Sequence, residues 1–162
     1  MHRLDLHWSY LAKIRSDGFY LTTGAAELLR LGVVYQMGRA KDLRPIIVVS
    51  FKRVDPKKVN YGEFCLAFIF VAVIVSRFML VPGVLESWIL VMDLCFLGIS
   101  ELDVTFVKNV VKICEDHFPG CLDYLFIYNA SLSVRLFLKT IHSKDIFIFS
   151  TLFTYFLYSI FC

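Results

Sequence analysis

The stretch RPIIVVSF (residues 44–51) decides the fold class of this chain. It is rich in β-branched residues, and its proline stands near the start, where a strand tolerates the loss of one N–H donor. Two further runs, SWILVMDL (87–94) and LDYLFIYN (122–129), are also apolar without a clear alternation. Continuous apolar runs of this length are typical of strands buried on both faces of a parallel sheet.

Helical patterns separate these three strands. Residues 61–80 are apolar almost throughout, and residues 101–117 repeat apolar side chains at helical spacing. A further helix is expected over residues 131–141, and two short helices are expected over residues 6–14 and 24–31. This order implies crossover connections, so the sequence predicts an α/β fold with a mixed, mainly parallel sheet flanked by helices and a small N-terminal helical lead-in.

The chain is long enough for one core, because domains of roughly 100 to 150 residues are the common unit. We expect an N-terminal helical segment over residues 1–33 and one α/β domain over residues 34–150. Residues 151–162 form an apolar tail without charge. Three interpretations of this tail stay open: an aberrant end of the chain, a cover over the domain, and a membrane anchor.

The composition is more apolar than a plain packed domain requires. Hydrophobic residues make up 58% of the chain and its mean hydropathy is +0.67, whereas soluble domains average roughly 45–50% apolar residues. A bilayer, a partner or an apolar ligand must cover this excess. The net charge of +3 is too small for a dedicated nucleic-acid binder. The five cysteines include no Cys-x-x-Cys pair and the first residues lack a signal-peptide core, which indicates a reducing, cytoplasmic location.

No catalytic or metal constellation emerges from the residue pattern. Ser100 lies in GISEL, which lacks the second glycine of a nucleophile elbow, and it is better explained as a helix cap. Cys114, His117 and Cys121 lack an evident fourth zinc ligand. Possible carboxylate pairs, Glu115 with Asp116 and Asp93 with Glu101, are explained by a helix surface, a cap or a strand end. We therefore expect no enzyme activity, no metal and no cofactor.

Two features admit more than one interpretation. The basic loop that contains Lys52, Arg53, Lys57 and Lys58 is either a solvated turn or a contact for an anionic membrane surface. The helix over residues 61–80 passes for a membrane span by hydropathy, but its unbroken apolar run, 64–75, is shorter than the roughly 20 residues that a bilayer requires. We expect a buried core helix.

Several motifs, in the right order, resemble those of CRAL-TRIO domains, the fold of yeast-type phosphatidylinositol and phosphatidylcholine transfer proteins. GRAKDLRPIIV (38–48) is similar to the family's Gly-Arg-Asp-x-x-x-Arg-Pro entry strand, with Ala40 in place of the aspartate. MDL (92–94) followed by LGIS (97–100) resembles its Asp-Leu-x-Gly-x-Ser stretch, and IYNA (127–130) resembles its Ile-Asn-Ala-Pro segment. The resemblance runs from about Gly32 to Ser150.

The resemblance implies a lipid site and the residues that serve it. Ser100 matches a serine that contacts phospholipid headgroups in some members, and Lys144 would be the headgroup lysine of a Ser-Lys-Ile-Phe strand. Arg135 and Lys139 fall on the segment that matches the gate helix, residues 131–141. Gly120 and Cys121 replace a Glu-Arg pair implicated in phosphoinositide handling, which argues against phosphatidylinositol specificity.

The predicted function is binding and transfer, or sensing, of a small hydrophobic ligand, with a phospholipid as the leading candidate, in an apolar pocket closed by the gate helix. We expect a cytoplasmic monomer that contacts membranes transiently and binds no nucleic acid. Two alternatives stay open. One is a small integral membrane protein with spans at 61–80 and 146–162. The other is a protein-interaction module with a vestigial pocket.

Overall fold

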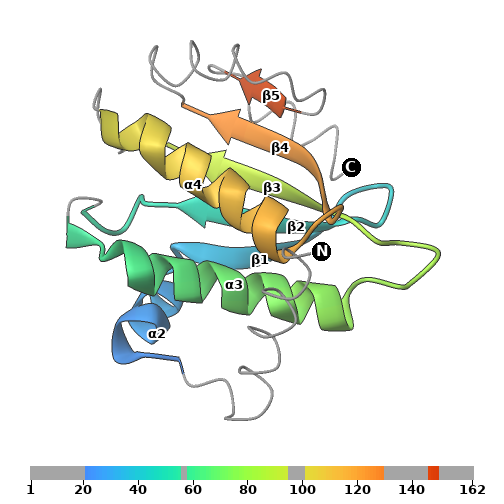
Figure 1. Cartoon of the computed structure of the whole chain (residues 1–162), viewed down its shortest axis with the longest axis horizontal. Coiled ribbons are helices and arrows are strands. Elements are labelled where there is room, and N and C mark those ends of the chain that lie inside the picture. Colours follow the sequence, from blue (N-terminus) through green and yellow to red (C-terminus); the bar gives the residue numbers. More distant parts are fainter. Residues whose placement is uncertain (1–20, 56–57, 95–100, 130–145, 150–162) are drawn as a thin grey trace.

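The computed structural model describes residues 21–55, 58–94, 101–129 and 146–149, with the backbone alone for 101–108 and 146–149. The expected helices 6–14 and 131–141 and the tail 151–162 lie outside these ranges. The described elements, labelled as in Figure 1, are α2 (Thr23–Arg30), β1 (Val34–Arg39), β2 (Pro45–Ser50), α3 (Tyr61–Phe78), β3 (Trp88–Asp93), α4 (Glu101–His117), β4 (Leu122–Tyr128) and β5 (Ile146–Phe149).

The strands form one sheet in the order β1-β2-β3-β4-β5. β1 is antiparallel to β2, and each later strand is parallel to its neighbour. The three buried runs of the sequence are adjacent central strands, with Val48 opposite Val91 and Val91 opposite Phe126. The predicted mixed, mainly parallel sheet is therefore confirmed, and the start of residues 146–162 supplies a strand as expected.

The strand β1 is absent from the sequence prediction, which was wrong to treat the run at residues 44–51 as the first strand. Gln36 and Gly38 interrupt its apolar pattern, and Gly38 adopts a positive φ of 75°. The pairing with β2 shifts register between Gln36 and Arg39. An edge strand that carries a bulge and a glycine relies on its partner for stability, so its own residues signal it weakly.

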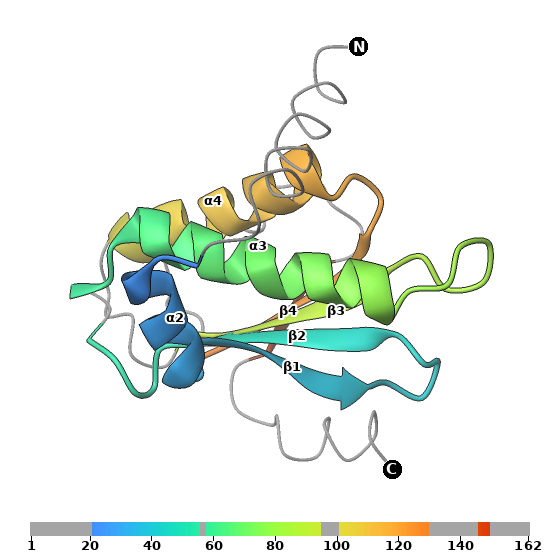
Figure 2. The same cartoon turned by 90° about the horizontal axis from the view of Figure 1, so that it is seen from below.

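The described helices lie on one side of the sheet (Figure 2). Thr22 is the N-cap of α2, because its side chain accepts a hydrogen bond from the Ala25 N–H. Glu63 of α3 accepts a second hydrogen bond from the same N–H at 2.9 Å, and the Thr22 hydroxyl also donates to this carboxylate. The start of α2 is thereby fixed to the start of α3.

The long helix α3 ends at Phe78, two residues before the predicted end. By length and composition alone it could cross a membrane. In the fold it packs against one face of the sheet. The residues that it buries are Phe64, Ala67, Phe68, Ile69, Val71, Ala72 and Val75. This burial supports the expected core helix, and the second span of the membrane-protein alternative lies outside the described residues.

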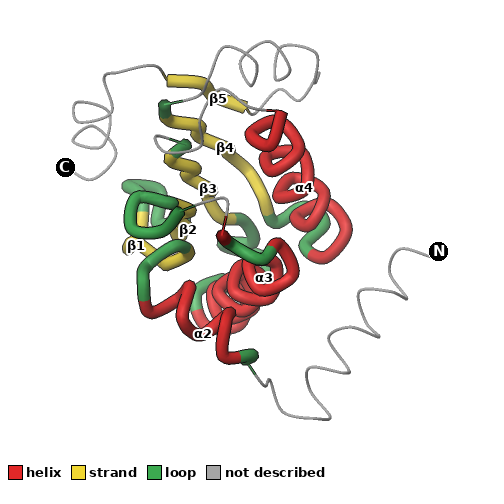
Figure 3. Tube along the Cα trace, turned by 90° about the vertical axis from the view of Figure 1, so that its left-hand side faces the viewer, coloured by secondary structure: helices red, strands yellow, loops and turns green. Residues whose placement is uncertain are grey.

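The described helices pack beside the sheet (Figure 3), and buried side chains from both form one large core. Phe64 packs at its centre, with ring centroids 5.8 Å from Phe51 and 6.2 Å from Phe68. Trp88, at the start of β3, meets Phe118 edge to face at 5.0 Å. Aromatic pairs in such geometries add to the hydrophobic stabilisation of a core. This core holds the sheet from one side and leaves the other face for a separate cluster.

Candidate functional site

Alternate residues of the three central strands form a second apolar cluster on the face opposite the helices. Successive side chains of a strand point to opposite faces, so the neighbours of the core residues Ile47 and Leu90 belong to this second face. We call this set the apolar floor, and its members are Ile46, Val48, Ile89, Val91 and Phe126. Each is only 2–7% exposed. The floor is therefore one apolar cluster across β2, β3 and β4 that is almost fully covered within the chain.

The apolar floor ends in a row of polar side chains at the carboxyl ends of the same strands. Ser50 is the register partner of Asp93, and Asp93 is the register partner of Tyr128. These three residues follow Val48, Val91 and Phe126 by two positions, so they share the face of the floor. We call them the polar row. In open α/β sheets, ligands bind at the carboxyl ends of parallel strands, which is where this row lies.

Asp93 is held by the end of the next strand. Asn129, directly after β4, donates a hydrogen bond from Nδ2 to Asp93 Oδ1 at 3.0 Å. Asn129 has a positive φ of 55°, a conformation that asparagine tolerates better than most residues. The local turn thus brings the amide back toward the neighbouring strand. The pair fixes the middle of the polar row.

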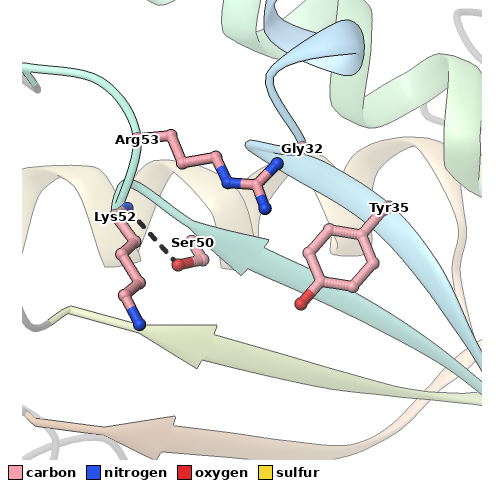
Figure 4. Close-up of a pocket in the computed structure, with 5 residues that line it drawn as sticks. All are labelled: Gly32, Tyr35, Ser50, Lys52 and Arg53. Atoms are coloured by element: carbon pink, nitrogen blue, oxygen red, sulfur yellow. Dashed lines mark hydrogen bonds between the residues drawn. The ribbon is translucent and has the colours of Figure 1, made fainter.

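A pocket of about 320 Å³ adjoins the polar row at β1 and β2. Its lining residues are Gly32, Tyr35, Ser50, Lys52 and Arg53. Figure 4 shows the Arg53 guanidinium and the Tyr35 ring facing the same space from opposite sides. Lys52 donates its backbone N–H to Ser50 Oγ at 3.4 Å, which turns the chain sharply after β2. Two cations and two hydroxyl groups therefore surround one opening.

The charges around this pocket favour an anionic group. Within the described residues, Lys52 and Arg53 form no ion pair. Burial raises the pKa of the Tyr35 hydroxyl, and the nearby Asp93 raises it further while Arg53 opposes the change. The tyrosine therefore stays a neutral hydrogen-bond donor at physiological pH. Donors of this kind beside two unpaired cations suit a phosphate or carboxylate.

The opposite end of the floor is closed by an ion-pair cluster. Arg44, just before β2, contacts Asp42 and Asp123 at 2.8 Å each. Its guanidinium also lies 5.2 Å from the ring centroid of Tyr124. Because Asp123 belongs to β4, one arginine connects the starts of two strands that flank β3. The Arg-Pro pair of the sequence motif thus has a structural role at the amino end of the floor.

The four predicted site residues, Ser100, Arg135, Lys139 and Lys144, all lie outside the described residues. Of the basic loop, Lys52 and Arg53 reach the pocket, whereas Lys58 lies 3.9 Å from Asp55 on the surface. The sequence reading missed the roles of Tyr35 and of the Asp93–Asn129 pair. The sequence signal for the Asp93–Asn129 pair was an aspartate that ends one buried strand and an asparagine that follows the next buried strand.

A metal centre finds no support in the described part of the chain. No group of three or more His, Cys, Asp or Glu side chains there could hold an ion. Burial raises the pKa of the Cys114 thiol to about 12, with smaller contributions from Cys121 and Glu115. Such a thiol is protonated at neutral pH, and it behaves as a small core hydrophobe.

The model of one protein family, described as the CRAL/TRIO domain, matches residues 29–144. The chain belongs to the CRAL/TRIO domain family. Proteins with this domain generally bind and transfer lipids and are not enzymes. Membership supports binding of a lipid or another small hydrophobic molecule, which agrees with an apolar floor that ends in a polar row.

A solved structure shares the CRAL/TRIO fold seen here. The crystal structure of Sfh5 aligns with a TM-score of 0.56 at 15% identity, over 78% of this chain. The chain spans 50% of the length of the Sfh5 chain. At this identity the match shows the fold alone. A search among curated proteins gives no match.

Proposed function

We propose that this CRAL/TRIO domain binds a phospholipid and transfers or senses it. The hydrocarbon chains lie along the apolar floor, and the headgroup lies at the polar row, within reach of Lys52 and Arg53. One observation carries the proposal: strand register places the floor and the polar row on the same face, in line along the same three strands. An amphipathic molecule matches such a surface, apolar along its length and polar at one end.

The energetic reason for a carrier is the cost of hydrocarbon in water. Each buried methylene contributes about 0.8 kcal/mol, so a 16-carbon chain left in water costs on the order of 12 kcal/mol. A lipid must therefore leave a bilayer for a surface that is equally apolar. The floor is such a surface, and a mobile segment over it would let the chain enter.

The remaining parts of the proposal follow the family resemblance. Residues 131–141 act as the gate helix that opens at a membrane, and Arg135 and Lys139 of this segment contact the lipid. The resemblance also assigns Ser100 and Lys144 to the headgroup site. The protein acts as a cytoplasmic monomer that contacts membranes transiently.

Lipid loading tests the floor directly. Purified protein is loaded with phosphatidylcholine or phosphatidylserine delivered by cyclodextrin and examined by native mass spectrometry. Replacing Val91 with Phe places a larger side chain on the floor where the hydrocarbon chain would lie, so the loaded fraction should fall by about tenfold. The matched control is Ile74→Phe on the outer face of α3, which should load normally. Equal loading of both variants with folded, stable protein would contradict the proposal.

The headgroup end is tested by charge reversal. The double variant Lys52→Glu and Arg53→Glu should lose several-fold in affinity for phosphatidylserine, because two cations at the pocket become anions. Lys112→Glu on the exposed side of α4 reverses one charge at a residue that does not line the pocket. If Lys112→Glu weakens loading as much as the double variant, net charge and not the pocket governs the affinity.

A further inference from the structure

Exposed large hydrophobic side chains gather at the end of the molecule opposite the cationic pocket. They lie in the turn between β1 and β2, at the last residue of α3 and in the loop that follows it, and we call them the apolar tip: Leu43, Phe78, Val81 and Val84. Their exposures are 64%, 77%, 51% and 83%. Figure 2 shows the loop after α3 projecting beyond the end of the sheet. Single exposed apolar residues are ordinary, but four on adjoining loops indicate an interaction surface.

Hydrogen bonds hold the two halves of the apolar tip together. Arg39 donates to the Leu43 carbonyl at 2.7 Å and to the Met79 carbonyl at 3.0 Å, so one guanidinium connects both loops. In the second loop, Val81 and Leu85 exchange backbone hydrogen bonds at 2.8 Å. Gly83 adopts a positive φ of 76° and donates its N–H to Glu86 at 2.8 Å. The exposed side chains are therefore presented by an ordered frame.

Leu43 occupies a backbone conformation that its side chain disfavours. Its φ is 68°, in the left-handed region where glycine or asparagine is the usual residue. A leucine that is 64% exposed there gains little from burial and costs conformational strain. Such outliers are commonly retained where function uses the side chain.

Basic side chains flank the apolar tip. The turn from Arg39 to Arg44 contains three basic residues and one acidic residue, and the segment from Arg77 to Glu86 contains one of each. Arg44 is bound to Asp42 and Asp123, whereas Arg39, Lys41 and Arg77 are exposed. An apolar tip with a net positive border complements an anionic lipid surface, with side chains in the acyl region and cations at the headgroups.

We propose that the apolar tip inserts into anionic bilayers and docks the protein on the membrane, at a place distinct from the lipid pocket and from the segment assigned as the gate. The tip consists of four side chains, whereas a stable protein interface buries about 800 Å² on each partner. Insertion into a bilayer requires no complementary pocket on a partner. This inference rests on the proposed function at one point, because a protein that carries lipids must contact a membrane.

Vesicle co-sedimentation of the full chain tests the docking. Wild-type protein should bind vesicles that contain phosphatidylserine several-fold more tightly than vesicles of phosphatidylcholine alone. The double variant Phe78→Ser and Val84→Ser should weaken binding to both kinds of vesicle by at least about tenfold. Lys41→Glu should reduce binding only where phosphatidylserine is present. Ile74→Ser, an apolar deletion on the outer face of α3, and Lys112→Glu are the matched controls and should bind as wild type.

A spectroscopic readout identifies insertion itself. Tryptophan introduced as Val84→Trp should shift its emission to the blue on addition of phosphatidylserine vesicles, whereas Ile74→Trp should not. The proposal is overturned if the emission of Val84→Trp stays unchanged. It is also overturned if the double variant Phe78→Ser and Val84→Ser binds vesicles as tightly as wild type. Light scattering tests for a dimer contact instead. If the wild-type protein self-associates with rising concentration and the same variant abolishes this association, the membrane-docking proposal is overturned.

Cargo binding is measured separately, so the two proposals fail separately. Loading from cyclodextrin, without vesicles, should be the same for wild type and the tip variants. Loss of docking with normal loading supports the tip, and loss of loading with normal docking affects the proposed function alone.

Discussion

On one side of the sheet, Ile47 and Leu90 share a core with the side chains of α3, whereas on the other side Ile46 and Ile89 belong to the smaller apolar floor. All four residues are almost fully buried. The first face is packed against aromatic rings of the helices, and the second runs into a polar row. Under the proposed function, equal burial serves a folding core on one face and a ligand surface on the other. Substitutions that separate stability from binding can test this difference.

The largest effect is expected at the centre of the helix-side core. Phe64→Ala removes a fully buried ring that packs between Phe51 and Phe68. The free energy of unfolding should fall by about 4 kcal/mol, since buried Phe→Ala substitutions leave large cavities. Phe78→Ala, at the exposed end of the same helix, should stay within about 0.5 kcal/mol of wild type. Urea denaturation followed by circular dichroism measures both.

Adjacent residues of β2 allow a direct comparison of the two faces. Ile47→Ala should destabilise the protein by about 3 kcal/mol whether or not lipid is bound, because its site is closely packed. Ile46→Ala should cost less, about 2 kcal/mol, in lipid-free protein and should also reduce the stabilisation gained on lipid loading. Thermal unfolding with and without lipid gives both quantities. If lipid stabilises the two variants to the same extent, the floor is not the ligand surface.

Alkaline pH should weaken the helix-side core through Cys114. Its pKa is raised from 9.0 to about 12 by burial, so the unfolded chain loses this proton at a lower pH than the folded protein does. Stability is therefore complete below about pH 9 and declines as the pH rises toward 12. The decline at about pH 10.5 should be on the order of 2 kcal/mol.

The Cys114→Ala variant is the control for this pH dependence. Its unfolding free energy should be lower at neutral pH but should decline less between pH 8 and pH 10.5, on the order-of-magnitude argument of linkage. Parallel curves for the variant and wild type would assign the alkaline decline to other groups, such as Cys65 and Cys121, whose pKa values are also raised by burial.

The smallest effect is expected at the amino end of the floor. A double-mutant cycle with Arg44→Met and Asp123→Asn should give a coupling energy of about 1 kcal/mol, because both side chains are partly shielded and the contact is short. The exposed pair of Arg30 and Glu27 should show no measurable coupling. A coupling near zero for Arg44 and Asp123 would mean that strand pairing alone orders this edge.

The sequence predicted the fold well because its central strands carry a strong local signal. Residues 44–51, 87–94 and 122–129 are each apolar and bounded by turns, and all three lie where expected. β1 escaped prediction because an edge strand with Gln36 and Gly38 is defined by its pairing with β2 and not by its own pattern.

The candidate site was harder to predict because it depends on register. Lys52 and Arg53 stood out as a basic loop, but Tyr35 joins them only through the pairing of β1 with β2. In the same way, Ser50, Asp93 and Tyr128 become a row only when three parallel strands are aligned. Uniformly apolar strands hide which residues face which side, and one residue of slippage would exchange the faces.

The alternation along β2, β3 and β4 has a consequence for how such a protein changes over evolutionary time. Under the proposed function, residues that shape the cargo surface and residues that hold the fold are sequence neighbours, yet a layer of backbone separates their side chains. A single substitution at Val48 or Val91 can reshape what the sheet accepts while Val49 and Met92 keep the helices in place. New ligand preferences are thus accessible in small steps without rebuilding the domain.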